Sequence, residues 1–148
     1  MIMLVDTGVL LRAFDRSAAE HQTILQAIRR ALNRGDKLAV TVQNIAGFWN
    51  VSTRPREKNG FDLSAGSVAR RLLVIERFCK VLPESTASFH EWKGLVNNYR
   101  VLGVKVHDAR LVSVMMAANI GMILTLNKRD FQRYAEISAV TPEEIVKP

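Results

Sequence analysis

Short apolar runs alternate along the chain with longer segments in which apolar residues recur at helical spacing. The short runs predict buried strands, and the longer segments predict helices with one apolar face. The expected strands cover residues 2–5, 38–42, 81–83 and 122–126. The expected helices cover residues 7–14, 18–33, 43–53, 64–78, 85–101 and 107–121. Strands that alternate with helices predict an α/β sandwich with a mainly parallel central sheet.

Turn residues separate these segments. Gly35 follows the second helical pattern, Pro55 stops the third, and Gly121 is expected to close the last one. Residues 56–62 are polar and charged and contain Asn59-Gly60, which predicts an exposed loop. A short apolar run at 137–140 precedes a capped turn at 141–144. No repeat or linker is visible, so we expect a single domain over residues 1–148.

Four aromatic side chains lie at helical spacing within the predicted helices. We expect them to pack in the core rather than to form platforms on which nucleic-acid bases stack. They are Phe48, Trp49, Phe78 and Trp92.

The chain is basic, with a formal net charge of +7 and an isoelectric point near 10.1. A basic surface favours nucleic acid or another polyanion as a partner, although the charge also serves solubility. No apolar run approaches the length that spans a bilayer, and the N-terminus is a poor signal peptide. The single Cys79 excludes an internal disulfide. We therefore expect a cytoplasmic protein.

Polar side chains follow the first and fourth predicted strands. Asp6 follows the first strand, Asn127 and Asp130 follow the fourth, and Asp108 lies at the start of a helix. Ligands of parallel α/β sheets bind outside the carboxyl ends of the strands. Clustered carboxylates repel one another unless a cation binds between them, and all-oxygen donors suit Mg²⁺ or Mn²⁺. These residues are candidate metal ligands.

Each of these residues also has a purely structural interpretation. Asp6 precedes a helix and is a suitable N-cap. Asp108 lies near the start of a helix, where its negative charge interacts favourably with the helix dipole. Asp130 is equally consistent with a cap or a surface residue, and Asn127 with a turn. Spacing alone leaves these alternatives open.

Three blocks of the sequence resemble the PIN-domain ribonucleases, especially the VapC-type toxins of bacterial toxin–antitoxin systems. The blocks are MLVDTGVLLRAF, TVQNIAGFWNVSTRP and HDARLVSVMMAANIGMILTLNKRDFQRY. They lie at the start, in the first third and near the end, so the resemblance spans the chain. It implies a PIN-like three-layer α/β/α sandwich with a short central sheet.

The resemblance also implies roles for particular residues. Asp6 and Asp108 match two metal-binding carboxylates of the family, and Asn127 or Asp130 matches the fourth acidic site. The family normally has Glu where this chain has Gly47, and commonly Asn where it has Gly8. Glycine supplies no ligand oxygen, so a degraded toxin, a rearranged site and a substitution that silences toxicity are all compatible with the sequence.

On this basis we expect a Mg²⁺- or Mn²⁺-dependent endoribonuclease of the toxin type, impaired by Gly47. Asp6, Asp108 and Asp130 would be catalytic, with Asn127 as a further ligand. Thr7, Arg12 and Arg54 are expected to contact the RNA substrate; for Arg54, a solvated loop is the alternative.

The same residues leave two other functions open. The first is a catalytically inactive PIN-fold module that binds an antitoxin or RNA. The second is a flap nuclease acting on DNA, which the small size of the chain disfavours. By resemblance, the expected partners are RNA, a small antitoxin protein and a second copy of the chain in a homodimer, with no membrane.

Overall fold

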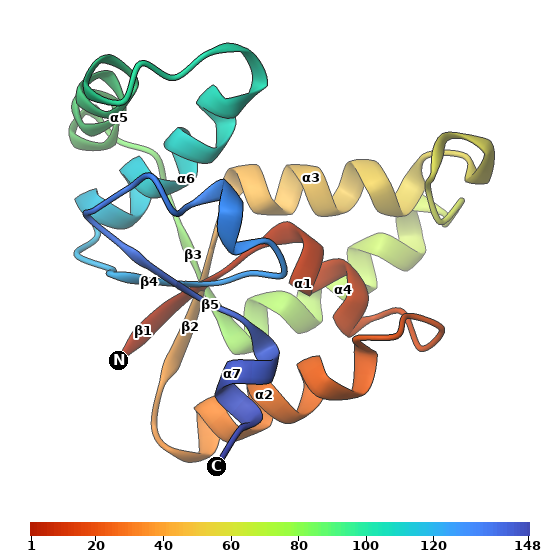
Figure 1. Cartoon of the computed structure of the whole chain (residues 1–148). Coiled ribbons are helices and arrows are strands. Elements are labelled where there is room, and N and C mark those ends of the chain that lie inside the picture. The colour runs from red at the N-terminus through yellow and green to blue at the C-terminus, as the bar shows by residue number, and fades with distance from the viewer.

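Five parallel strands form the centre of the molecule in the computed structural model, which describes residues 1–148 (Figure 1). Every pair of neighbouring strands in the sheet is parallel, and the order is β3-β2-β1-β4-β5. The strands are β1 (Ile2–Val5), β2 (Lys37–Thr41), β3 (Cys79–Leu82), β4 (Met122–Leu124) and β5 (Ser138–Val140). The predicted α/β architecture is confirmed, and the apolar run at 137–140 proves to be a fifth strand.

Seven helices connect or follow the strands. They are α1 (Thr7–Ala13), α2 (His21–Asn33), α3 (Val42–Thr53), α4 (Ala65–Phe78), α5 (Thr86–Asn98), α6 (Val106–Ala117) and α7 (Pro142–Val146). Short 3-10 turns occur at η1 (Arg56–Lys58), η2 (Gly103–Lys105) and η3 (Lys128–Asp130). No helix combines the length and the apolar character that crossing a membrane requires.

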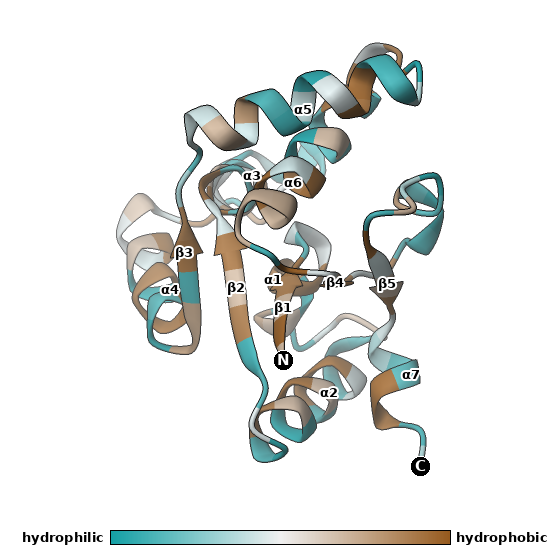
Figure 2. Cartoon of the chain, turned by 90° about the vertical axis from the view of Figure 1, so that its left-hand side faces the viewer, coloured by the Kyte–Doolittle hydropathy of each residue, from teal (hydrophilic) through white to brown (hydrophobic).

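The helices cover both faces of the sheet, because successive side chains of a strand point to opposite faces. Met3 and Val5 pack in one core with α1, α2, α3, α4 and α7, whereas Leu4 packs in the other with α5 and α6. Figure 1 shows α5 and α6 together on one side of the sheet. Figure 2 shows β1 and β2 mostly in brown, as expected for strands that are buried on both faces. The three-layer sandwich is therefore confirmed.

Several predicted boundaries were wrong by a few residues. β3 begins at Cys79 rather than at 81, because Cys79 is in register with Leu38 of β2. α2 begins at His21 rather than at 18, because the Asp15 carboxylate accepts hydrogen bonds from the backbone and hydroxyl of Ser17 and holds a turn. α6 ends at Ala117, where Asn119 rather than Gly121 takes the left-handed conformation at φ 57°.

The prediction of an aromatic core holds for Phe48 and fails for Phe78. Phe48 is 1% exposed, whereas Phe78 is 56% exposed at the end of α4. Trp49 and Trp92 are partly buried against the two cores. Helical spacing alone did not distinguish an aromatic residue on a buried helix face from one at a helix end that is exposed at the surface.

The loop after α3 depends on the absence of a side chain at Gly60. A Cβ atom there would lie 1.9 Å from the backbone oxygen of Arg54 and 2.3 Å from its Cγ. By contrast, a Cβ at Gly94 of α5 meets nothing within 4 Å. We predict that Gly60→Ala lowers the free energy of unfolding by about 1–3 kcal/mol, measured by urea denaturation. Gly94→Ala should raise it by up to about 1 kcal/mol, because alanine favours the helix. Equal effects of the two substitutions would contradict this packing.

Candidate functional site

Asp6 lies between the end of β1 and the start of α1, at the carboxyl edge of the sheet. Its backbone N–H donates to the Leu124 carbonyl of β4 at 3.0 Å, so the neighbouring strand fixes its position. Its carboxylate accepts from the backbone of Thr7 at 2.8 Å and from the hydroxyl of Thr125 at 2.8 Å. The Asp6 side chain thus caps the helix locally and also faces the end of β4.

The Thr125 hydroxyl connects Asp6 to the segment that carries the other polar candidates. Thr125 is fully buried, and its Oγ1 accepts from the backbone N–H of Asn127 at 3.1 Å while it donates to Asp6. Burial raises the pKa of Asp6, and the charge of Asp130 adds to that rise. The hydrogen bonds from Thr125 and Thr7 act in the opposite direction on this pKa and favour the ionised carboxylate.

Asp108 lies in the first turn of α6, and its carboxylate faces the same region. Its side chain is 25% exposed. Burial, followed by the charge of Asp130, raises the pKa of Asp108 from 3.8 to about 6; Lys105 lowers it, and Asp6 raises it further. The charges of Asp6 and Asp130 therefore act on the pKa of Asp108, and the charge of Asp130 acts on the pKa of Asp6.

Asp130 and Asn127 lie on the segment that follows β4. Asp130 ends η3, and its carboxylate accepts from the ammonium group of Lys105 at 2.9 Å. Asn127 precedes η3 with an exposed side chain, and its backbone is held by Thr125. Of the two residues that match the fourth acidic site, Asp130 is therefore the one that interacts with the other carboxylates.

Two amide side chains at the start of α3 anchor the residues next to Asp6 and Asp108. The Gln43 amide nitrogen donates to the backbone oxygen of His107 at 2.9 Å. The buried Asn44 amide nitrogen donates to the hydroxyl of Thr7 at 3.2 Å. These contacts place α3 beside both carboxylate-bearing turns, and they fix Thr7 through Asn44.

Gly47 lies one turn further along α3 and faces Thr7. A Cβ atom at this position would lie 3.2 Å from the Thr7 methyl carbon and 3.4 Å from the Thr7 hydroxyl oxygen. A longer side chain at position 47 would therefore begin beside the residue that follows Asp6. Gly8, which was expected to depart from the family pattern as Gly47 does, lies next to Arg12, whose guanidinium donates to the Gly8 carbonyl at 3.2 Å.

Arg12 and Arg54, both expected to contact substrate, line one cavity of about 520 Å³ between α1 and the end of α3. Arg12 pairs with Glu20 at 3.4 Å, and Asp15 also lines this cavity. Arg54 donates to the Asn59 carbonyl at 3.3 Å, while its buried Nε has no partner. None of the three acidic candidates lines this cavity, so the structure brings the two arginines together apart from the carboxylates.

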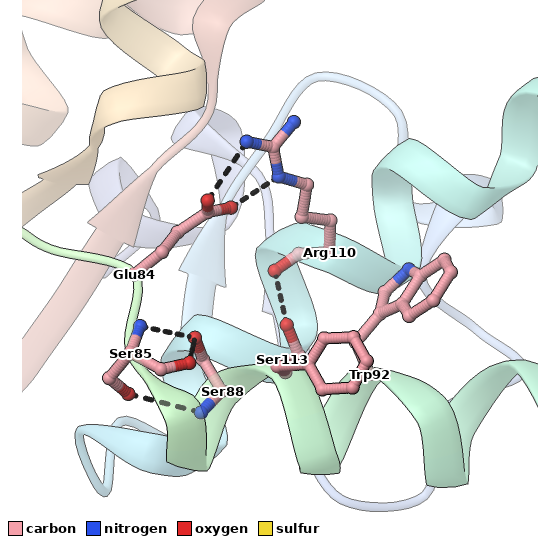
Figure 3. A pocket seen from close by; sticks show the side chains of 7 residues that line it. Glu84, Ser85, Ser88, Trp92, Arg110 and Ser113 are labelled. Atoms are coloured by element: carbon pink, nitrogen blue, oxygen red, sulfur yellow. Dashed lines mark hydrogen bonds and ion pairs between the residues drawn. The ribbon is translucent and has the colours of Figure 1, made fainter.

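A second cavity, of about 250 Å³, lies between α5 and α6 (Figure 3). Arg110 of α6 forms a two-pronged ion pair with Glu84 on one side of it, and Trp92 and Ser113 lie on another. Because both charged groups are paired with each other, Arg110 braces α6 against the segment before α5. Its contribution to the site is to hold the helix that carries Asp108.

The donors of the acidic cluster suit a divalent metal in kind, since they are carboxylate oxygens whose mutual repulsion an ion would relieve. They are not arranged as a finished metal site, because no three His, Cys, Asp or Glu side chains lie close enough together to hold an ion. The Asp130 carboxylate is instead paired with Lys105. A metal ion that bound this Asp130 oxygen would have to displace the Lys105 ammonium group.

Four residues around the acidic cluster were not predicted from the sequence: Gln43, Asn44, Lys105 and Thr125. Thr125 and Lys105 had a visible signal, because each is a polar residue close in sequence to a candidate carboxylate. The partners of Gln43 and Asn44 lie 64 and 37 residues away along the chain, and only the fold reveals them.

Comparisons with known proteins identify the family. A family model for the PIN domain matches residues 3–137. The chain belongs to the PIN domain family. None of the curated proteins compared with it matches this PIN domain by sequence.

Several solved structures share the fold. VapBC-1 from nontypeable Haemophilus influenzae has a TM-score of 0.71 at 14% identity, and covers 97% of this chain and 99% of its own. VapC20 of Mycobacterium tuberculosis, a Sarcin-Ricin loop cleaving toxin, has a TM-score of 0.63 at 14% identity, with 93% and 99% covered. A toxin–antitoxin complex from Klebsiella pneumoniae has a TM-score of 0.60 at 15% identity, with 95% and 97% covered. At these identities the likeness establishes a shared fold for the PIN domain.

The raised pKa of Asp108 predicts a pH-dependent stability in the presence of a chelator. The folded PIN domain holds the Asp108 proton more tightly than the unfolded chain does, so folding takes up a proton between pH 3.8 and about 6. The contribution of Asp108 to stability therefore falls as the pH rises through this window, and the penalty is complete above about pH 6.

We predict that Asp108→Asn raises the free energy of unfolding by about 1–2 kcal/mol at pH 8, a range discounted for the partial exposure of Asp108. The gain should vanish near pH 4, where the native carboxyl is protonated. Urea denaturation of both proteins in EDTA from pH 4 to pH 8 measures the difference. A gain that does not change with pH would mean that the charge of Asp108 is not the cause.

Proposed function

We propose that this PIN domain is a metal-dependent endoribonuclease of the toxin type whose activity is reduced by Gly47. The observation that carries the proposal is that Asp6, Asp108 and Asp130 act on one another electrostatically at the carboxyl edge of the parallel sheet. Burial first, and then the charge of Asp130, raises the pKa of both Asp6 and Asp108. Perturbed carboxyl pKa values that lie close together are concentrated at functional sites.

In this proposal Asp6 and Asp108 hold Mg²⁺ or Mn²⁺, with Asp130 as the third carboxylate and Asn127 beside it. A bound ion would supply the positive charge that activates a water and stabilises the leaving oxygen of a phosphodiester. Thr125 orients the Asp6 carboxylate and favours its ionised form by donating to it at 2.8 Å. Arg110 and Gln43 hold the first turn of α6, and with it Asp108, in place.

RNA is the proposed substrate, because the chain carries a net charge of +7 and phosphate contacts dominate such binding. The cavity that Arg12 and Arg54 line, apart from the acidic cluster, is a candidate contact for a more distant part of the RNA backbone, since Arg54 retains a buried Nε–H without a partner. Thr7 would contact substrate from the turn that carries Asp6. Comparing cleavage of single-stranded RNA with cleavage of branched DNA separates this proposal from a flap nuclease, which would prefer the DNA.

We predict that Asp6→Asn lowers the rate of RNA cleavage in Mn²⁺ by about a hundredfold or more, because an amide neither carries charge nor binds the ion as strongly. Gly47→Glu should raise the rate above that of the unmodified chain, since it adds a carboxylate beside Thr7 after a small shift of the Thr7 methyl group. Cleavage of a labelled single-stranded RNA measures both effects.

Gly47→Gln is the matched control for that experiment. It adds the same bulk against Thr7 without the charge, so a gain from Glu alone identifies the restored carboxylate as the cause. If Gly47→Glu brings no gain and Asp6→Asn no loss, the assignment of the acidic cluster as a catalytic centre fails.

A second candidate function is a PIN-fold module that binds RNA or an antitoxin without cutting. Gly47 favours it, because the chain offers one carboxylate fewer than the family pattern. The pairing of Asp130 with Lys105 favours it as well. Calorimetric titration with Mn²⁺ separates the two functions: binding that is lost in Asp108→Asn supports the nuclease, and an absence of binding supports the inactive module.

We further propose a small antitoxin protein as partner, because solved relatives of this fold include a toxin–antitoxin complex. The candidate surface is an apolar cavity of about 420 Å³ between α1, α2 and α4, which Phe14, Ile28, Val74 and Phe78 help to line. Phe78 is the exposed aromatic at its rim.

We predict that a short reading frame adjacent to the gene encodes this antitoxin. Phe78→Ser should weaken copurification of its product with the chain, whereas Phe89→Ser should not. Phe89 is comparably exposed at 52% but lies on α5, outside the cavity. Equal copurification of both variants would exclude this surface. Light scattering after size-exclusion chromatography tests the proposed homodimer separately, because a mass of 16.6 kDa for the chain alone indicates a monomer.

A further inference from the structure

Lys105 brings a positive charge into the acidic cluster from the segment just before α6. Its ammonium nitrogen lies 2.9 Å from an Asp130 carboxylate oxygen and 3.8 Å from an Asp108 carboxylate oxygen. It therefore interacts with two of the three carboxylates proposed to hold the metal. The only other ion pair of the segment after β4 joins Lys128 to Glu144, away from the cluster.

The positive charge of Lys105 has the same sign as a divalent ion and interacts with the same oxygens. As long as the ammonium group is paired with these carboxylates, it reduces the negative potential that would attract a divalent ion. It also uses the Asp130 oxygen directly, so a metal that bound this oxygen would have to displace it. With Gly47 in place of an expected glutamate, the cluster has fewer carboxylates, so Lys105 neutralises a larger share of its negative charge.

The segment that carries Lys105 is only lightly anchored. Lys105 ends the single turn η2, which starts at Gly103 with φ 58°. Leu102 and Val104, on either side of Gly103, are both exposed rather than packed in the core. The Lys105 side chain itself is 49% exposed, so its ammonium can turn into solvent without opening the core.

We propose that Lys105 is an internal counter-cation that competes with the divalent ion for Asp108 and Asp130 and so weakens metal binding by this PIN domain. The inference rests on the proposed function, since it presupposes that these carboxylates bind an ion. It assigns Lys105 a role in controlling occupation of the site rather than in the chemical step.

The test is calorimetric titration of the purified chain with Mn²⁺, alongside Lys105→Met, Lys105→Arg and Lys128→Met. Lys105→Met removes the charge and keeps the length of the side chain, and we expect it to bind Mn²⁺ about fivefold more tightly than the unmodified chain. Lys105→Arg keeps the charge and should stay within about twofold of the unmodified chain.

Lys128→Met is the matched control, because it also deletes one lysine from a 2.9 Å ion pair and changes the net charge equally. It should leave Mn²⁺ affinity unchanged if the effect belongs to the acidic cluster. Thermal melting in EDTA checks that each variant is folded, and the melting temperature of Lys105→Met should rise more on addition of Mn²⁺ than that of the unmodified chain.

The outcomes separate this inference from the function on which it rests. If Asp108→Asn abolishes Mn²⁺ binding but Lys105→Met binds no more tightly than the unmodified chain, the role of Lys105 is overturned and the metal centre stands. If neither the unmodified chain nor Lys105→Met binds Mn²⁺, or if Asp108→Asn binds as well as the unmodified chain, the metal centre and the role of Lys105 both fail.

Discussion

A partly buried carboxylate at the end of the first strand is the constraint around which this site is built. Burial disfavours the charge of Asp6, and two hydrogen bonds, from Thr7 and Thr125, partly offset the cost. Thr125 can reach Asp6 only because β1 and β4 are parallel neighbours, with Val5 in register with Leu124. The pairing of the strands therefore decides where the first carboxylate points and what else can lie near it.

The other charges of the cluster follow from that arrangement. The segment after β4 carries Asp130 toward the region of Asp6, and α6 presents Asp108 from the side covered by α5. Three carboxylates gathered in this way destabilise one another when ionised. One lysine, Lys105, is paired with two of these carboxylates and partly offsets their repulsion.

Much of this fold was predictable because its signals are local. The apolar run before Asp6, the capping residues Ser64 and Ser85, and the alternation of strands and helices gave the element order and the layered sandwich. The first and last residues of the helices and strands were less predictable, because they depend on contacts with residues that are distant in sequence. Cys79 joins β3 through its register with β2, and a three-residue strand such as β5 has too little pattern to distinguish it from a loop.

In the candidate site, too, some residues had a local signal in the sequence and others depend on partners that are distant in sequence. Asp6, Asp108 and Asp130 were visible in the sequence as acidic residues at element ends, and in the fold their charges act on the pKa values of Asp6 and Asp108. The residues that position them, Gln43 and Asn44, have ordinary local patterns and act on partners on other elements. Lys105 was counted only as part of the net charge, since the sequence does not reveal which carboxylate a lysine faces.

The most direct test of a shared cation is a crystal of the protein soaked in Mn²⁺, with anomalous diffraction used to locate the metal. The account predicts a peak between the carboxylates of Asp6 and Asp108, with ligand oxygens at about 2.1 Å, and the Lys105 ammonium moved away from Asp130. An anomalous peak elsewhere, or clear density for both carboxylates with no metal between them at saturating Mn²⁺, would contradict it.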